Sequence, residues 1–247
     1  MPGKDAIAPT DNLLLGALPG EDYRRLQPHL EPVALPFGKV ISEPGERVSH
    51  VLFPTAGIVS MLLSLEDGLS VETAIIGNES GVGISSLLEG ARGNGARYRR
   101  VVTLAGQAYR LRMDLLIKEF ERGGELRHRL LLHIQAKITQ IAQTAMCNRH
   151  HRLEMQVCRW MLMRLDRVAS SELRATHEQI ANQLGVRREG VTEVAGHLQS
   201  GGLIHYRRGD IVVLDRPGLE RRVCECYGVI EKEYARLLRV RFPSTGG

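Results

Sequence analysis

Cysteine and histidine are the residues of this chain with the most specific chemistry, because both can ligate a metal ion. Cys147, His150 and His151 form one group, and Cys147 and His150 would share a helical face. No fourth ligand is evident nearby. Cys224 and Cys226 stand two residues apart in an expected helix, about 200° around its axis, so they would not share one ion. The sequence therefore predicts no metal site and no cofactor.

Catalytic patterns are also missing. The chain has no Ser/His/Asp order, no Walker loop and no His-Glu-x-x-His, since His177-Glu178 lacks the second histidine. We predict that the protein is not an enzyme. The four cysteines, which include Cys158, are expected to be free thiols in a reducing compartment, and redox sensing through them stays open.

A basic hairpin tip is the clearest site for an electrostatic interaction. Residues 203–206 and 211–214 are apolar runs typical of two strands, and Arg207-Arg208-Gly-Asp lies between them. Arginines at such a tip can contact phosphates, which gives affinity without sequence information. The whole chain carries 33 Lys and Arg against 28 Asp and Glu, a net charge of +5, which also suits a polyanion.

Two short helices are expected just before this hairpin. Thr176 is a plausible N-cap with Gln179 three residues on, as in a capping box, and Gly185 would end the first helix. The second helix is expected over residues 187–199, with its apolar side chains on one side. Two helices joined by a tight turn at glycine have the helix-turn-helix layout, and the hairpin beside them would be a wing.

A long helix is expected over residues 125–146, followed by a hinge at 147–151 and another helix over 153–168. Apolar residues in the long helix repeat every three or four positions, as in a coiled-coil seam, whereas Arg127, His133 and Lys137 are polar. We favour this seam as a dimer interface, and the alternative is that it packs on its own domain. The seam comprises Leu131, Ile134, Ile138, Ile141 and Ala145.

The first half of the chain has a sequence pattern typical of short strands. Glycines recur between apolar runs at 48–53, 58–65, 70–76 and 101–104. Asp67-Gly68 separates two of these runs and is a strong hairpin signal. This spacing suggests a small antiparallel barrel or jelly roll, with a loop carrying one helical turn over residues 77–95.

From roughly residue 13 to 238 the chain resembles the Crp/Fnr family of bacterial transcription regulators. The run His177-Glu-Gln-Ile-Ala-Asn-Gln-Leu-Gly185-Val-Arg-Arg-Glu-Gly-Val191 is similar to the family's helix-turn-helix, and Leu35-Pro-Phe-Gly-Lys-Val-Ile to Gly57 is similar to its roll. The resemblance implies an α+β fold in three parts. These are a β-roll (jelly-roll, cyclic-nucleotide-binding-like) domain at 1–116, a dimerisation helix at 117–147 and a winged helix-turn-helix domain at 148–247.

The resemblance also implies which residues contact DNA. By their place in the resemblance, Arg188 and Glu189 occupy base-reading positions, where Arg can pair bidentately with guanine and Glu can accept from the cytosine amino group. Glu193 departs from the arginine of the best-known members, which points to a different half-site or to a solvated residue beyond the bases. The implied base-reading set is Arg187, Arg188, Glu189, Thr192 and Glu193, and the implied phosphate contacts are Thr176, His177, Arg207 and Arg208.

The effector pocket of the family is poorly matched. Its Arg-Ser or Arg-Thr pair, which would hold a cyclic nucleotide's phosphate, is missing, although Asn78, Glu79 and Arg97 stand in the corresponding region. No cysteine precedes Cys147, so the iron-sulfur branch is excluded. A histidine in or near the roll, His29 or His50, leaves haem control open.

We therefore expect a sequence-specific transcription regulator that binds double-stranded DNA as a homodimer and is not controlled by cAMP. The alternative is a regulator switched by a cyclic nucleotide or another small ligand in the roll. RNA polymerase is an expected partner. No apolar run approaches the roughly 20 residues of a membrane span, and the N-terminus is unlike a signal peptide, so we expect no membrane partner and a cytoplasmic location.

Overall fold

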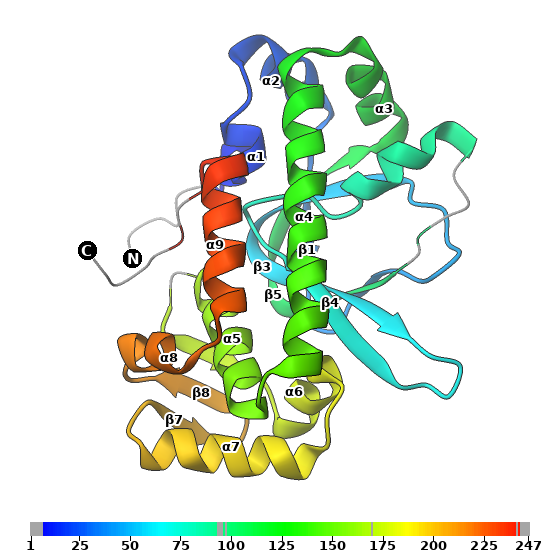
Figure 1. Ribbon diagram of the computed structural model, residues 1–247. Coiled ribbons are helices and arrows are strands. Elements are labelled where there is room, and N and C mark those ends of the chain that lie inside the picture. The colour runs from blue at the N-terminus through cyan, green and yellow to red at the C-terminus, as the bar shows by residue number, and fades with distance from the viewer. Residues whose placement is uncertain (1–6, 93–95, 97, 169, 241, 243–247) are drawn as a thin grey trace. The chain divides into compact units, whose positions relative to one another are not determined.

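The computed structural model describes residues 7–92, 96, 98–168, 170–240 and 242 (Figure 1). The chain divides into two compact units. Unit 1 comprises Met1–Ser60 and Ile75–Gln135, and unit 2 comprises Met61–Ala74 and Ala136–Gly247. In the part of the chain described, no helix is long and apolar enough to cross a membrane.

An antiparallel sheet with short helices beside it forms the framework of unit 1. The sheet has five strands in the order β1-β5-β3-β4, with β2 also paired to β5. Its strands are β1 (Glu31–Leu35), β2 (Val40–Ser42), β3 (His50–Ser64), β4 (Ser70–Ile76) and β5 (Arg99–Arg112). The helices are η1 (Pro9–Asp11), α1 (Leu13–Gly16), α2 (Gly20–Leu26), η2 (Gln27–His29), η3 (Ile84–Arg92) and α3 (Met113–Arg122).

The runs expected at 48–53 and 58–65 are one continuous strand, β3, and not two. Gly57 in its middle has φ +89°, a conformation that favours glycine. A Cβ on the facing Gly106 would lie 2.1 Å from the carbonyl oxygen of Ala56, so β5 approaches β3 closely here. The glycines that suggested a turn therefore mark a close approach of two long strands.

The expected hairpin at Asp67-Gly68 is confirmed between β3 and β4. Gly68 has φ +88°, and the Asp67 carboxylate accepts a hydrogen bond from the Leu69 N–H. The core of unit 1 forms where the sheet meets α1, α2, α3 and the start of the long helix. It includes Leu14, Leu15, Leu26, Val51, Phe53, Leu111, Leu116, Leu126 and Leu130.

Helix α4 (Gly124–His150) is the longest helix and extends the expected one by four residues at its C-terminal end. The expected hinge at 147–151 is accordingly wrong in extent, because Cys147 to His150 are helical. Only His151 and Arg152 separate α4 from α5 (Leu153–Leu165). The Gln156 side chain donates to the His151 carbonyl and helps to fix this break.

Unit 2 is built around α5, in which every residue from Gln156 to Leu165 is buried. In the described part of the unit, α5 is accompanied by the end of α4, by the tip of the β3–β4 hairpin, and by a three-stranded sheet in the order β6-β8-β7 with four more helices. These elements are β6 (Glu172–Arg174), α6 (His177–Leu184), α7 (Arg188–Ser200), β7 (Ile204–Arg207), β8 (Asp210–Val213), α8 (Arg216–Arg222) and α9 (Glu225–Leu238). The expected α+β class, roll and winged helix-turn-helix are confirmed, whereas the division at 116 and 147 stays a prediction.

Candidate nucleic-acid interface

The first helix of the expected pair, α6, begins with a complete capping box. The Thr176 hydroxyl accepts from the Gln179 N–H, and the Gln179 side chain accepts from the Thr176 N–H, at 3.2 and 2.8 Å. These bonds satisfy two of the backbone donors that a helix start leaves open. The predicted cap is therefore confirmed, and it fixes where α6 begins.

The turn between α6 and α7 depends on one glycine. Gly185 has φ +69° and caps α6 in the left-handed conformation, with its N–H donating to Ala181. Helix α7 then starts at Arg188 and buries one face. The buried side chains are Val191, Val194, Ala195 and Leu198, as the periodicity predicted.

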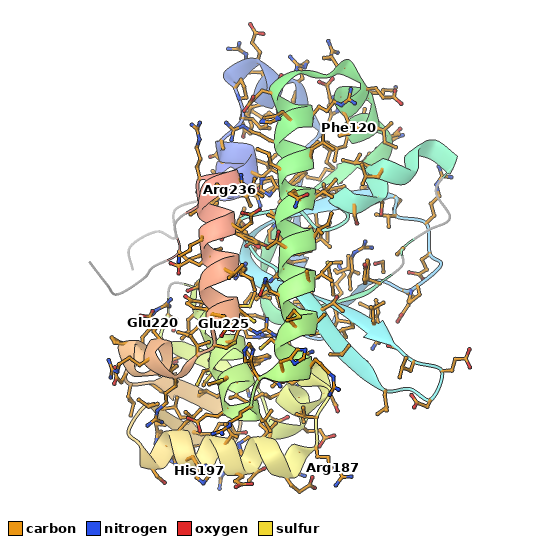
Figure 2. The ribbon with its side chains drawn as sticks, in the orientation of Figure 1. Phe120, Arg187, His197, Glu220, Glu225 and Arg236 are labelled. Carbon is orange, nitrogen blue, oxygen red and sulfur yellow. The ribbon has the colours of Figure 1, made fainter. Side chains whose placement is uncertain are left out.

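The opposite face of α7 is exposed. It carries Arg187, at the N-cap, together with Arg188, Glu189, Thr192 and Glu193. Figure 2 shows Arg187 and His197 projecting from α7 away from the rest of its unit. Among the residues that the structure describes, no carboxylate pairs with Arg187 or Arg188. Two cations at the start of an exposed helix are thus left to interact with something outside the chain.

The His177 side chain connects α6 to both α7 and the wing. The ring of His177 stacks on Tyr206, and its Nδ1 lies 2.9 Å from the Thr192 hydroxyl. That hydroxyl donates to the Arg188 carbonyl at 3.1 Å, so it accepts from His177. Burial, and then the charge of Arg188, lower the pKa of His177. The His177 side chain is engaged within the unit, and its phosphate contact stays a prediction.

The wing is a tight hairpin with an exposed basic tip, as expected. In it β7 pairs with β8, and Arg207 faces Asp210 across the turn. The two turn residues, Arg208 and Gly209, have φ +51° and +91°, typical of a type I′ turn, whose twist suits a hairpin. Arg207 and Arg208 are both exposed. Strand β6, which pairs with β8, was not predicted because three residues carry too little periodicity to identify.

A buried cluster of polar side chains next to α6 was not predicted from the sequence. Arg164 of α5 donates to Gln183 of α6 and to Glu72 of the β3–β4 hairpin, at 2.7 and 2.6 Å. Gln183 also accepts from the Trp160 indole, over whose ring Arg164 lies. Within unit 2, these contacts fix α6 against α5. No sequence signal marks them, because Glu72 and Arg164 are 92 residues apart.

The predicted dimer seam is largely exposed on α4. Leu131 and Ile138 are 39% and 54% exposed, Ala145 is exposed, and Ile134 and Ile141 are half-buried. The face of α4 that the protein buries instead includes polar residues. One of them is His133, which is buried with its Nδ1 3.1 Å from the Ser80 hydroxyl.

The effector pocket expected around Asn78, Glu79 and Arg97 stays a prediction, and two of these residues lie in the described part of unit 1. Glu79 is fully buried and accepts a hydrogen bond from the Gly77 N–H, whereas the Asn78 carbonyl accepts from Leu13. Arg97 lies outside the described residues. A different cavity of about 200 Å³ is lined partly by Lys39, Ser42, Arg47, His50, Arg100 and Arg110.

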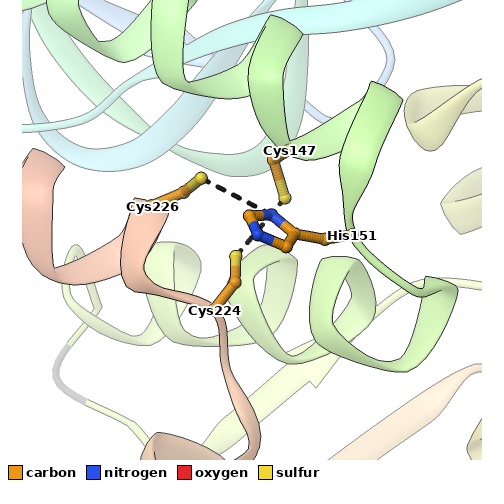
Figure 3. A group of neighbouring side chains, drawn as sticks. All are labelled: Cys147, His151, Cys224 and Cys226. Carbon is orange, nitrogen blue, oxygen red and sulfur yellow. Dashed lines mark hydrogen bonds between the residues drawn. The ribbon is translucent and has the colours of Figure 1, made fainter.

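The expectation that Cys224 and Cys226 point apart is wrong. Cys224 is the N-cap of α9, with φ −77° and ψ 163°, so it precedes the helix and does not follow the helical rotation. Its Sγ lies with those of Cys226 and Cys147 and a nitrogen of His151 (Figure 3). The partner of Cys147 in this group is His151, four residues on and just past the end of α4, and not His150.

Comparison with known proteins agrees with this geometry. Residues 156–222 match the Crp-like helix-turn-helix domain. The global nitrogen regulator of Synechococcus elongatus is 24% identical over 192 residues, which cover 75% of this chain and 86% of that protein. A solved transcriptional regulator of the Crp/Fnr family from Eubacterium rectale is 17% identical with a TM-score of 0.66, covering 84% of this chain and 96% of its own. FixK2 from Bradyrhizobium japonicum is 16% identical with a TM-score of 0.65, covering 79% and 98%.

The fold and the exposed helix pair are thus those of a helix-turn-helix DNA-binding domain. The chain contains a Crp-like helix-turn-helix domain and is similar over most of its length to transcription regulators of the Crp/Fnr family.

Proposed function

We propose that the protein binds a specific DNA sequence as a homodimer, with α7 in the major groove and the wing on the backbone. The observation that carries this proposal is the exposed start of α7, where Arg187 and Arg188 have no carboxylate partner among the described residues. Arg207 and Arg208 at the wing tip supply phosphate contacts. A chromosomal target would put the protein in the cytoplasm.

Base reading is assigned to the first turns of α7. Arg188 suits guanine and Glu189 suits the amino group of cytosine. Glu193 lies one turn after Glu189 on the same exposed face and extends this reading, while Arg187 lies at the helix start. Thr192 has its hydroxyl bonded to His177 and to the Arg188 carbonyl, so its methyl group is the part left for a base.

Selection of bound sequences from a random duplex pool, with full-length protein and no added ligand, tests the proposal. We expect a two-fold symmetric site with half-sites about one helical turn apart. Arg188→Ala should lose preference at one position of each half-site. Failure to enrich any sequence, with and without cyclic nucleotides, would contradict the proposal.

The dimer is assigned to the seam on α4. Apolar side chains at heptad spacing that stay exposed on one helix are expected to pack on the same helix of a second copy. Ile138→Glu should convert the dimer to a monomer in sedimentation. Leu88→Glu, the same substitution at a residue that is 58% exposed in unit 1, is the matched control and should remain dimeric. Equal dissociation of both variants would contradict this assignment.

Contact with RNA polymerase completes the proposed role. Transcription in vitro from a promoter carrying the selected site would test it, because a regulator must change transcript yield when the site is present. Unchanged yield at every spacing between site and promoter would remove this part of the proposal.

Effector control is a second candidate, favoured by the cavity of about 200 Å³ in unit 1. Its lining includes Lys39, Arg47, Arg100 and Arg110 besides Glu46, and Arg110 pairs with Glu31, so the remaining positive charge suits an anionic ligand. Calorimetry with cyclic nucleotides distinguishes the candidates. Heat of nucleotide binding together with a change in DNA affinity would establish control by an effector. DNA binding by a protein that gives no heat with cyclic nucleotides would favour the cAMP-independent regulator.

A further inference from the structure

Three cysteines and one histidine meet at the junction of α4, α5 and α9 inside unit 2. Cys147, Cys224 and Cys226 are 0%, 3% and 2% exposed, and His151 is partly buried beside them. One ligand atom from each of the four lies within 4.8 Å of all the others. Figure 3 shows all four side chains directed toward one another from separate segments of the chain. We propose that Cys147, His151, Cys224 and Cys226 form a structural zinc site.

The distances between the ligand atoms match those around a tetrahedral ion. With Zn–S near 2.3 Å and Zn–N near 2.0–2.1 Å, tetrahedral geometry places two sulfurs about 3.8 Å apart and a sulfur and a nitrogen about 3.5 Å apart. The Sγ atoms of Cys147 and Cys224 are 3.5 Å apart, and Nδ1 of His151 is 3.6 Å from Sγ of Cys226. A Cys₃His set is a usual zinc donor set, and four protein ligands make the site closed and structural.

The backbone explains why four ligands from distant segments converge. Cys147 and His151 are four residues apart at the end of α4, where the His151 N–H still donates to the Cys147 carbonyl. Cys224 is in extended conformation before α9, and Cys226 lies in its first turn. The extended N-cap removes the rotation that would separate two cysteines of a continuous helix.

The surroundings of the four residues suit a metal-bound state. The Glu225 carboxylate lies 3.4 Å from Nε2 of His151. It can accept a hydrogen bond from an Nε2–H group, which leaves Nδ1 free to bind the ion.

A buried arginine supplies the matching charge. Arg159 is only 4% exposed, and no carboxylate among the described residues pairs with it. It contacts the Thr144 hydroxyl and acts electrostatically on Cys147 and Cys226. Zn²⁺ with three thiolates and a neutral imidazole carries a net charge of −1, which would balance the buried guanidinium.

A zinc ion here would fasten the start of α9 to the end of α4, joining residues that are 77 positions apart. That link lies inside unit 2, which contains the helix-turn-helix. None of the four ligands belongs to the reading face of α7, so the proposal does not depend on the proposed function.

The first test is the metal content of the full-length protein, purified under reducing conditions without chelator. We expect about one zinc ion per chain, released by a thiol reagent together with a fall in melting temperature. Cobalt(II) in place of zinc should give a thiolate-to-metal charge-transfer band and the strong visible bands of a tetrahedral site.

Variants distinguish this site from adventitious binding. Cys226→Ser and His151→Ala should each either show a weaker charge-transfer band with cobalt or lose the bound metal. Glu225→Gln should keep the site but weaken zinc affinity about tenfold. Cys158→Ala is the matched control, because Cys158 is buried in the same unit outside the group, and it should bind like the wild type.

Three results would overturn the proposal. They are a folded, reduced wild-type protein that binds neither zinc nor cobalt, stoichiometric iron in place of zinc, and zinc binding that Cys226→Ser and His151→Ala leave unchanged. A Cys147–Cys224 disulfide formed in protein that never takes up metal would instead assign the pair to redox chemistry. The wild-type measurements decide the question even if a variant fails to fold.

Discussion

The imidazole of His177 stacks on the ring of Tyr206 with 4.2 Å between ring centroids and 23° between planes. His177 is the first residue of α6 and Tyr206 belongs to strand β7 of the wing. This contact, together with the hydrogen bond from His177 to Thr192 of α7, joins the three parts of the DNA-binding surface at one side chain.

The histidine should make the stability of this unit depend on pH. Its pKa in the folded protein is lowered from 6.5, first by burial, so the unfolded chain binds the proton more readily. The contribution to the free energy of unfolding is therefore present above about pH 6.5 and is lost as the pH falls through the folded-state pKa. His177→Asn keeps an N–H donor for Thr192 but does not titrate. Urea unfolding of the variant should change less over this pH range, and equal slopes for both proteins would contradict the assignment.

Removal of the Arg188 side chain should weaken specific binding more than non-specific binding. A bidentate arginine–guanine pair is worth about 1–3 kcal/mol of discrimination, so Arg188→Ala should raise the Kd for the selected site roughly tenfold or more. Arg122→Ala removes the same charge from an exposed residue of unit 1 and is the control. Titration of labelled duplexes measures the Kd of both variants. An equal loss of affinity in the two would mean that Arg188 acts only through its charge.

Replacement of Arg208 by glycine should separate stability from DNA binding. Arg208 has φ +51°, which costs a non-glycine residue free energy, so Arg208→Gly should raise the free energy of unfolding by about 0.5–1 kcal/mol. The same variant should also lose one of the proposed phosphate contacts, so the salt slope of binding should fall by about 1.

Arg207→Gly provides the comparison. Arg207 lies in strand β7, and glycine is unfavourable in a strand. It should lose a similar salt slope without the gain in stability. Equal stability changes in the two glycine variants would show that the turn conformation is not the cause.

Gly106→Ala should destabilise unit 1. The added Cβ would lie 2.1 Å from the Ala56 carbonyl oxygen and 2.5 Å from the Gly57 nitrogen, and backbone atoms of a paired strand cannot easily move aside. We expect a loss of about 2–3 kcal/mol in thermal or urea unfolding. Gly228→Ala, in an open position of α9, should instead stabilise slightly because alanine favours helix. A neutral Gly106→Ala would show that β3 and β5 can separate there.

Local signals in the sequence were sufficient for the DNA-binding surface. The capping box at Thr176 and Gln179, the left-handed Gly185 and the basic turn at Arg208-Gly209 each depend on residues only a few positions apart. Their backbone conformations follow from side-chain chemistry and steric limits, so they could be identified without a tertiary structure. The heptad spacing on α4 was readable for the same reason.

Contacts between distant segments were decided only by the tertiary structure. Arg164 meets Glu72, and Cys147 meets Cys224, across 92 and 77 residues, and no periodicity connects such pairs. A local rule applied to Cys224 and Cys226 even gave the wrong answer, because it assumed one continuous helix where the chain is extended at the N-cap. The sequence determined the helix cap and tight turns of the DNA-binding surface and the buried apolar face of α7. Packing decided which side chains from different elements share a buried volume, since that depends on the path of the whole chain.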